Sequence, residues 1–188
     1  MLAMEPGSAF GLDVVNGHLG EIDPRLIMFY RYWDGARGVK PMPARSDVDP
    51  LDIPQDLLPN LFLVEVVDGG RRFKFRLVGS ESTIAAGRSL TGFHVDEINP
   101  NKAYGDYVTN LYRRVLTRKR PVLSVSNFGL PDQEHRMTQR IMCPLSPDGQ
   151  IVTMVISCQV FDVPPQNWRR VSLTSGDAFE GLFEAVIV

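Results

Sequence analysis

The segment 61–78, LFLVEVVDGGRRFKFRLV, constrains the fold of this chain more than any other. An apolar run is followed by the turn-forming sequence Asp68-Gly69-Gly70. Large apolar side chains then alternate with cations in the order Arg72, Phe73, Lys74, Phe75, Arg76 and Leu77. A period of two places the apolar side chains on one face of a sheet and the cations on the other. The segment therefore predicts two antiparallel strands joined by a tight turn.

The composition limits the class of protein. A chain of 188 residues with 44% apolar and 22% charged residues is typical of one soluble globular domain with extensions. Its net charge of −2 argues against a nucleic-acid partner, which selects for a basic surface. No apolar stretch is long enough to cross a bilayer, and residues 1–11 lack the features of an export signal. These features predict a cytoplasmic protein that does not bind membranes.

The two cysteines, Cys143 and Cys158, are predicted to be free. If residues 146–149 form a hairpin turn, Cys143 lies opposite Val152, and Cys158 lies about 20 Å further along the strand. A disulfide requires much closer Cα atoms. We expect two packed thiols in a reducing compartment.

The N-terminal third divides into a tail, a helix and a connector. Residues 1–20 show no periodicity and are expected to be a mobile tail, and residues 21–60 are expected to hold a cap helix and a proline-rich connector. Asp23 and Pro24 are typical of a helix start. An apolar stripe follows at helical spacing, formed by Leu26, Ile27, Tyr30 and Trp33. A helix this short is unstable alone, so it must pack against something.

The remaining elements follow in a clear order. Residues 80–92 predict short helical turns, and a longer helix is predicted from Asn99-Pro100 to the basic residues before Pro121. Three strands are predicted over 122–128, 136–145 and 151–161. In the C-terminal extension, 164–188, the apolar residues fit either a helix or a strand.

This order resembles that of the PAS domain over residues 61–163. The resemblance depends on the segments Phe75–Gly79, Gly87–Gly92, Pro144-Leu145 and Asp148-Gly149. It implies an α+β fold with a five-stranded antiparallel sheet, short helices on one face and an N-terminal cap helix. The flanking segments Tyr32-Trp33, Pro41–Arg45 and Asp49–Leu51 resemble a subfamily of short, single-domain bacterial PAS proteins common in alphaproteobacteria.

PAS domains are sensory and interaction modules. The resemblance implies a stand-alone signalling module that binds a small ligand or a protein partner, signals to a regulatory partner in trans and catalyses no reaction itself. The cap helix is expected to cover the outer sheet face of its own domain or of a second copy. In the second case it would form a homodimer through Leu26, Ile27, Tyr30 and Trp33.

Candidate ligand-binding residues are those expected between the long helix and the sheet. They are Phe75, Leu77, Ile84, Phe93, Val108, Leu111, Tyr112, Val125, Ile141, Met154 and Ile156. Tyr112 and either Ser124 or Ser126 are the candidate polar anchors. The alternative is a filled core, because apolar side chains at such spacing also pack without a cavity.

The sequence leaves the cofactor unknown. Haem-binding PAS domains carry their axial histidine on the long helix, whereas His94 precedes that helix and His135 is expected at the surface. Neither cysteine has the Asn-Cys-Arg context of flavin photosensors. The scattered histidines and cysteines lack the spacing of metal ligands.

Two further features leave alternatives open. A basic cluster near the end of the long helix is interpreted as a solvated helix end that offsets the helix dipole, with binding of phosphate or an acidic protein as the alternative. Its residues are Arg113, Arg114, Arg118, Lys119 and Arg120. A small enzyme would need a buried carboxylate or histidine facing the cavity, for which Glu65 and Glu81 are the nearest candidates. A purely structural interaction protein with a solid core is the third hypothesis.

Overall fold

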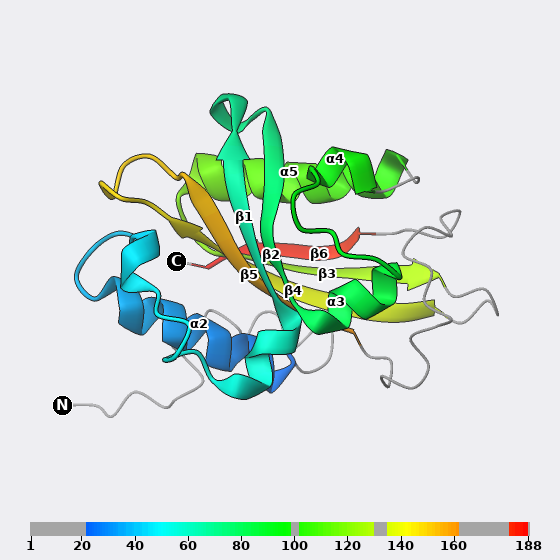
Figure 1. Ribbon diagram of the computed structural model, residues 1–188, viewed down its shortest axis with the longest axis horizontal. Coiled ribbons are helices and arrows are strands. Elements are labelled where there is room, and N and C mark those ends of the chain that lie inside the picture. The colour runs from blue at the N-terminus through cyan, green and yellow to red at the C-terminus, as the bar shows by residue number, and fades with distance from the viewer. Residues whose placement is uncertain (1–21, 99–101, 130–134, 162–180, 188) are drawn as a thin grey trace.

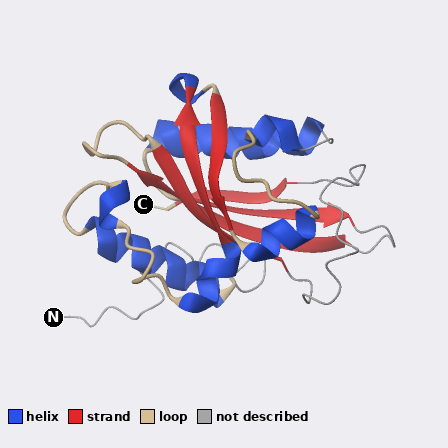
Figure 2. Ribbon diagram, in the orientation of Figure 1, coloured by secondary structure: helices blue, strands red, loops and turns tan. Residues whose placement is uncertain are grey.

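The computed structural model describes residues 22–98, 102–129, 135–161 and 181–187. They form one antiparallel sheet with the strand order β2-β1-β5-β4-β3-β6, drawn in red in Figure 2. The strands are β1 (Leu61–Val67), β2 (Arg72–Val78), β3 (Val122–Gly129), β4 (His135–Leu145), β5 (Met154–Phe161) and β6 (Gly181–Val186). Because β1 pairs with β5, the front strand pair and the rear strands form one sheet. The predicted five-stranded α+β fold is confirmed, and the C-terminal extension adds β6 as a sixth strand.

Helices cover both faces of the sheet. The cap helix α2 (Pro24–Arg37) lies on one face, while α3 (Ser80–Ala86), α4 (Val95–Ile98) and α5 (Lys102–Arg118) lie on the other (Figure 1). The connector after α2 contains two short 3-10 helices, η2 (Arg45–Asp47) and η3 (Gln55–Asn60), and a third, η4 (Asp68–Gly70), joins β1 to β2. The predicted mobile tail, 1–20, lies outside the described residues, as does most of 164–188.

The cap helix α2 packs against the sheet of its own chain. Asp23 Oδ1 accepts the backbone N–H of Arg25 at 2.9 Å, which caps the helix as its sequence predicts. The buried stripe is Leu26, Phe29 and Trp33, and the indole N–H of Trp33 donates to the carbonyl oxygen of Pro144 at 2.9 Å. These contacts join α2 to the end of β4.

The proposed dimer interface needs a correction at two positions. Leu26 and Trp33 are 1% and 2% exposed within the single chain, so they do not form an open dimer surface. Their apolar area is already covered by the domain's own sheet. Ile27 and Tyr30 are half-buried. Dimerisation itself stays a prediction.

The two sheet faces differ in chemistry. Arg140 and Met142 of β4, with Ser157 and Gln159 of β5, point toward α5. Their neighbours in sequence point toward α2, because side chains alternate along a strand. The α2 face therefore holds a nearly continuous apolar surface that includes Ile141, Cys143, Ile156, Cys158 and Val160.

The register between β4 and β5 differs from the predicted hairpin. Leu145 pairs with Met154, so the connection is longer than a four-residue turn, and Cys143 pairs with Ile156. Cys158 lies two residues beyond that pair, and such diagonal neighbours are about 7–8 Å apart. The predicted separation of about 20 Å is therefore wrong. The predicted state of both cysteines, free and buried, is confirmed.

Candidate ligand-binding cavity

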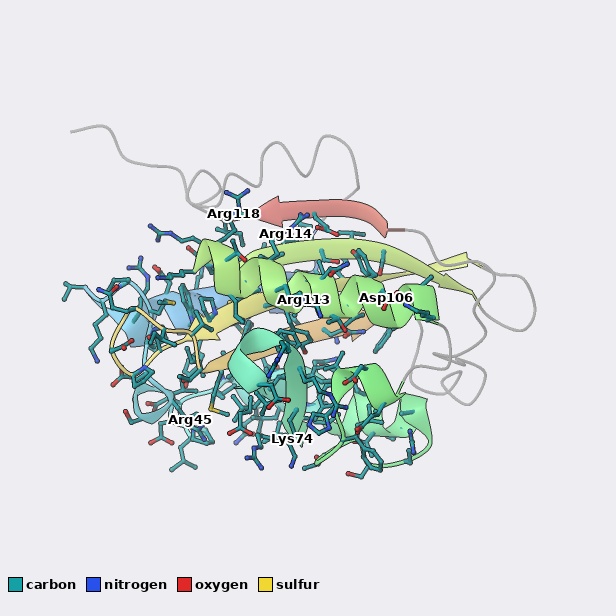
Figure 3. The ribbon with its side chains drawn as sticks, turned by 90° about the horizontal axis from the view of Figure 1, so that it is seen from above. Arg45, Lys74, Asp106, Arg113, Arg114 and Arg118 are labelled. Carbon is teal, nitrogen blue, oxygen red and sulfur yellow. The ribbon has the colours of Figure 1, made fainter. Side chains whose placement is uncertain are left out.

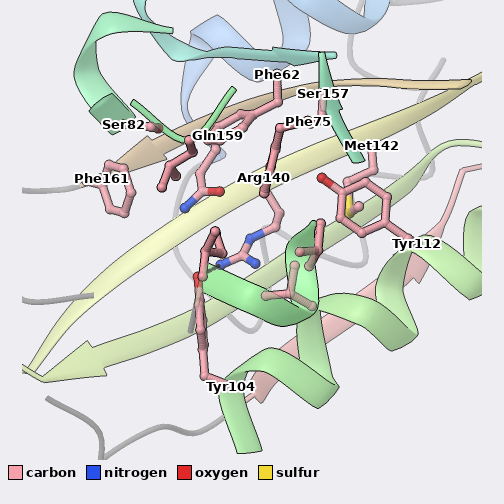
Figure 4. Close-up of a pocket in the computed structure, with 14 residues that line it drawn as sticks. Phe62, Phe75, Ser82, Tyr104, Tyr112, Arg140, Met142, Ser157, Gln159 and Phe161 are labelled. Atoms are coloured by element: carbon pink, nitrogen blue, oxygen red, sulfur yellow. Dashed lines mark hydrogen bonds between the residues drawn. The ribbon is translucent and has the colours of Figure 1, made fainter. Parts of the chain in front are cut away.

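A cavity of about 50 Å³ lies between the sheet and the helices α3, α4 and α5 (Figure 4). Strands β1, β2, β4 and β5 form one wall. The rings of Phe62 and Phe75, 6.0 Å apart, line the wall on the β1–β2 side. Val95 and Ile98 of α4 also line the cavity. Most of its surface is therefore apolar.

The charged group on the wall is Arg140 of β4. Its side chain is 3% exposed and reaches toward Tyr104 of α5 (Figure 4). Nη2 donates to the Tyr104 hydroxyl at 3.2 Å and to Ser126 Oγ at 3.3 Å. The guanidinium carbon also lies 5.6 Å from the centre of the Tyr104 ring, within the range of a cation–π contact. Arg140 is thus held in place by neutral groups.

Helix α5 presents three tyrosines to this region. Tyr112 stacks on Phe73 with ring centres 5.0 Å apart, and burial raises the pKa of its hydroxyl, which bonds to Ser157. The hydroxyls of Tyr107 and Ser124 lie 2.6 Å apart, and burial raises the pKa of Tyr107. Both phenols therefore stay protonated at neutral pH and act as neutral hydrogen-bonding groups.

Three of the predicted ligand-binding residues line the cavity together: Phe75, Val108 and Tyr112. Of the predicted anchors, Ser124 and Ser126 lie outside the lining, where they bond to Tyr107 and to Arg140.

Three other candidates are exposed, with exposed fractions of 47% for Leu77, 60% for Ile84 and 40% for Phe93. Leu77 changes face because the pairing shifts by one residue between Leu63 and Val64. Such a bulge moves the following side chains to the opposite side of the sheet.

The last group of candidates lies away from the cavity, and all of its members are buried except Met154, which is half-buried. Leu111 packs in the core without lining it. The others lie on the α2 face of the sheet, because directly paired residues of neighbouring strands share a face and their partners point toward α2. They are Val125, Ile141, Met154 and Ile156. The alternation of side chains separates two faces in each strand. The more apolar face, which was expected to line the cavity, lies under α2 instead.

The sequence reasoning missed Arg140, Tyr104, Ser157 and Gln159. Arginine is almost never fully buried, so its position in a strand gave no reason to place it inside. Tyr104 precedes Val108 and Tyr112 by four and eight residues, and this helical spacing was the available signal.

A second hollow lies on the opposite face, between the connector and strands β1, β2 and β5. It measures about 240 Å³ and is lined by Val48, Ile53, Leu63, Leu77 and Ile156, among others. It contains two of the residues that were predicted for the cavity.

The other candidate groups lie at the surface. The ring nitrogen Nδ1 of His94 is 3.2 Å from Glu97 Oε2, and His94 does not line the cavity. Among the described residues, no three His, Cys, Asp or Glu side chains lie close enough to hold a metal ion. Glu65 pairs with Arg76 at 2.7 Å and Glu81 bonds to Asn60, and neither carboxylate lines the cavity.

The basic end of α5 is exposed, as Figure 3 shows for Arg113, Arg114 and Arg118. Arg114 forms an ion pair with Glu184 of β6, and Arg113 donates to Asn110 at 3.1 Å. Part of this charge is therefore balanced within the chain.

The fold and the site define the chain as an α+β domain with an internal cavity between a sheet and a long helix. Residues 23–156 match the family model described as PAS domain, which is more than half of the chain. The chain belongs to the PAS domain family.

Two solved structures are similar to the chain at low identity. The PAS domain of BvgS from Bordetella pertussis is 14% identical, with a TM-score of 0.46 over 65% of this chain and 93% of that one. VqmA in the ligand–DNA complex from Vibrio cholera is 15% identical, with a TM-score of 0.44 over 65% of this chain and 57% of that one. No curated protein matches the chain. None of the helices in the described segments is long and apolar enough to cross a membrane.

Proposed function

We propose that this PAS domain is a sensory module that binds a small ligand in the cavity under α5 and signals through contact with a regulatory protein. The observation that supports this most directly is the lining itself. A mostly apolar wall that carries a few fixed polar groups is typical of small-molecule sites. The proposal assigns the domain no catalytic step, since neither Glu65 nor Glu81 lines the cavity.

A ligand in the cavity would touch an element that also forms part of the surface. Val95 and Ile98 of α4 line the cavity, while Asp96 and Glu97 between them pair with Arg72 of β2 at 3.0 and 2.7 Å. A ligand that displaces α4 therefore rearranges exposed charges on the edge strand β2. We propose that this change is what a partner protein recognises.

The remaining features of the proposal concern context. We propose that the protein acts in the cytoplasm, supported by its two buried free cysteines. We also propose that it forms a homodimer and belongs to the short alphaproteobacterial PAS subfamily that its flanking segments resemble.

A cavity-filling variant tests the function. Val108→Phe adds a ring to the cavity wall, and Thr117→Ser changes an exposed residue of the same helix as a control. Native mass spectrometry of the freshly purified protein and thermal-shift screening of small metabolites should detect ligands for the wild type and the control. Val108→Phe should stay folded and bind none of them.

The competing function is a structural interaction module whose core is effectively filled, which the small cavity volume favours. In that case neither measurement detects a ligand for the wild type. The same result would contradict the sensory proposal.

A further inference from the structure

We infer that the cavity takes a small carboxylate with an apolar body, and that Arg140 binds its carboxylate group. The inference rests on the proposed ligand-binding function and names the ligand class for that site. The observation behind the inference is the buried guanidinium of Arg140 in the cavity wall.

Arg140 lacks a counter-ion among the residues that the structure describes. Its Nη2 bonds only to the hydroxyls of Tyr104 and Ser126, and its buried Nε has no hydrogen-bond partner. No described carboxylate lies within 4.0 Å of the guanidinium. A buried charge is costly unless an opposite charge and hydrogen bonds compensate for it. A bound anion would supply both.

The geometry and charge of the site favour a carboxylate. A guanidinium presents a planar set of donors that matches a carboxylate in two parallel hydrogen bonds. Arg140 is the sole cation among the described residues that line the cavity, so the site balances one negative charge. A phosphate group carries between one and two negative charges at neutral pH and is a poorer match.

The rest of the wall selects the body of the ligand. Phe62, Phe75, Val108 and Phe161 offer it apolar contacts. Ser82 Oγ is buried without a hydrogen-bond partner and also lines the cavity, so it can bond to a second polar atom. A volume of about 50 Å³ compares with roughly 10–15 Å³ for one water molecule measured in the same way. A cavity that holds a benzene ring measures about 150 Å³, so this site suits a short-chain acid rather than a ring acid.

Matched acids and amides test the inference. Isothermal titration of the full chain with propionate and butyrate is compared with propionamide and butyramide, and inorganic phosphate is a separate arm. Each acid differs from its amide in charge but hardly in shape. We expect the acids to bind at least tenfold more tightly than the amides and more tightly than phosphate. Methyl NMR of Met142, which lines the cavity, should shift with the acids.

Variants assign the preference to Arg140. Arg140→Gln should remove the preference for acids, Arg140→Lys should retain part of it, and the exposed Arg113→Gln should leave it unchanged. If Arg140→Gln does not fold, the inference is tested by the difference between acids and amides in the wild type and by its reduction in Arg140→Lys.

The possible failures are distinguishable. Acids and amides that bind equally, or phosphate that binds more tightly than the acids, would overturn the inference and leave the sensory function standing. If the acids do not bind, the inference also fails, and the function fails with it only if the metabolite screen is negative.

Discussion

At the scale of single residues, Gly79 shows how closely two backbone segments approach each other. It follows β2, donates its N–H to the Leu61 carbonyl at 2.7 Å and lies against Pro59. A Cβ at position 79 would lie 2.2 Å from the Pro59 carbonyl oxygen, a backbone atom that cannot rotate away. Gly79→Ala should lower the free energy of unfolding by about 1–3 kcal/mol, as overpacking does, measured by urea denaturation.

Gly35 provides the matched control. It lies inside α2, and a Cβ there meets nothing within 4 Å. Gly35→Ala should leave the free energy of unfolding unchanged or raise it by up to about 1 kcal/mol, because glycine disfavours a helix. Equal losses of stability in the two variants would contradict the close approach at Gly79.

The two thiols give a second prediction at this scale. Burial raises the pKa of Cys158 to about 12 and that of Cys143 well above its usual range. Since the thiolate is the reactive form, a disulfide reagent at pH 8 should modify neither cysteine in the folded protein and both after unfolding in urea. Rapid modification of one thiol in the folded state would show that the α2 face is open to solvent.

At the scale of elements, the Glu97 carboxylate holds α4 to both His94 and Arg72. Glu97 accepts hydrogen bonds first from the His94 backbone N–H, then from Arg72 and the His94 ring, and they lower its pKa to about 2. Because this pKa is lowered in the folded state, the contribution of Glu97 to stability is complete above about pH 4.5 and is lost as the pH falls toward 2.

We therefore expect amide exchange in α4 to accelerate between pH 4.5 and 2. Glu97→Gln should show fast exchange already at neutral pH and lose the acid dependence. NMR titration of the Glu97 side chain gives the midpoint directly. A midpoint near that of an ordinary glutamate would contradict the predicted anchoring of α4.

The limits of the sequence prediction also appear at this scale. The order of the elements was predictable, because strand alternation and helix caps are local signals. The sheet face that carries the cavity was not predictable, because alternation alone does not say whether α2 or α5 covers Ile141. The bulge that turns Leu77 outward and the longer β4–β5 connection depend on pairing between distant segments.

Part of the candidate site was predictable as well. Phe75, Val108 and Tyr112 lie at positions where strand and helix periodicity place a side chain between the sheet and the long helix. Arg140 was not predictable, because arginine is usually exposed.

At the scale of the molecule, α2 and α5 make the sheet the middle of three layers. The layer between α5 and the sheet contains the cavity and its polar groups, while α2 buries an apolar surface on the opposite face, beside the hollow under the connector. The contacts of α2 thus stabilise the sheet, and the cavity under α5 is available for a ligand. This division suggests that α2 contributes to stability independently of ligand binding.

Removal of α2 tests that division. A chain that begins at residue 39 lacks Leu26, Phe29 and Trp33, each at most 2% exposed, and opens the apolar α2 face to water. Burial of a large apolar side chain contributes roughly 1.5–3 kcal/mol, so three lost anchors approach the whole stability of a domain, about 5–15 kcal/mol. We expect the truncated chain to lose its cooperative thermal transition and to bind a hydrophobic dye such as ANS. Trp33→Phe, which keeps a smaller aromatic ring but loses the hydrogen bond to the Pro144 carbonyl, should retain a cooperative transition at a lower midpoint. A truncated chain that melts cooperatively at the wild-type midpoint would show that the sheet does not need this cover.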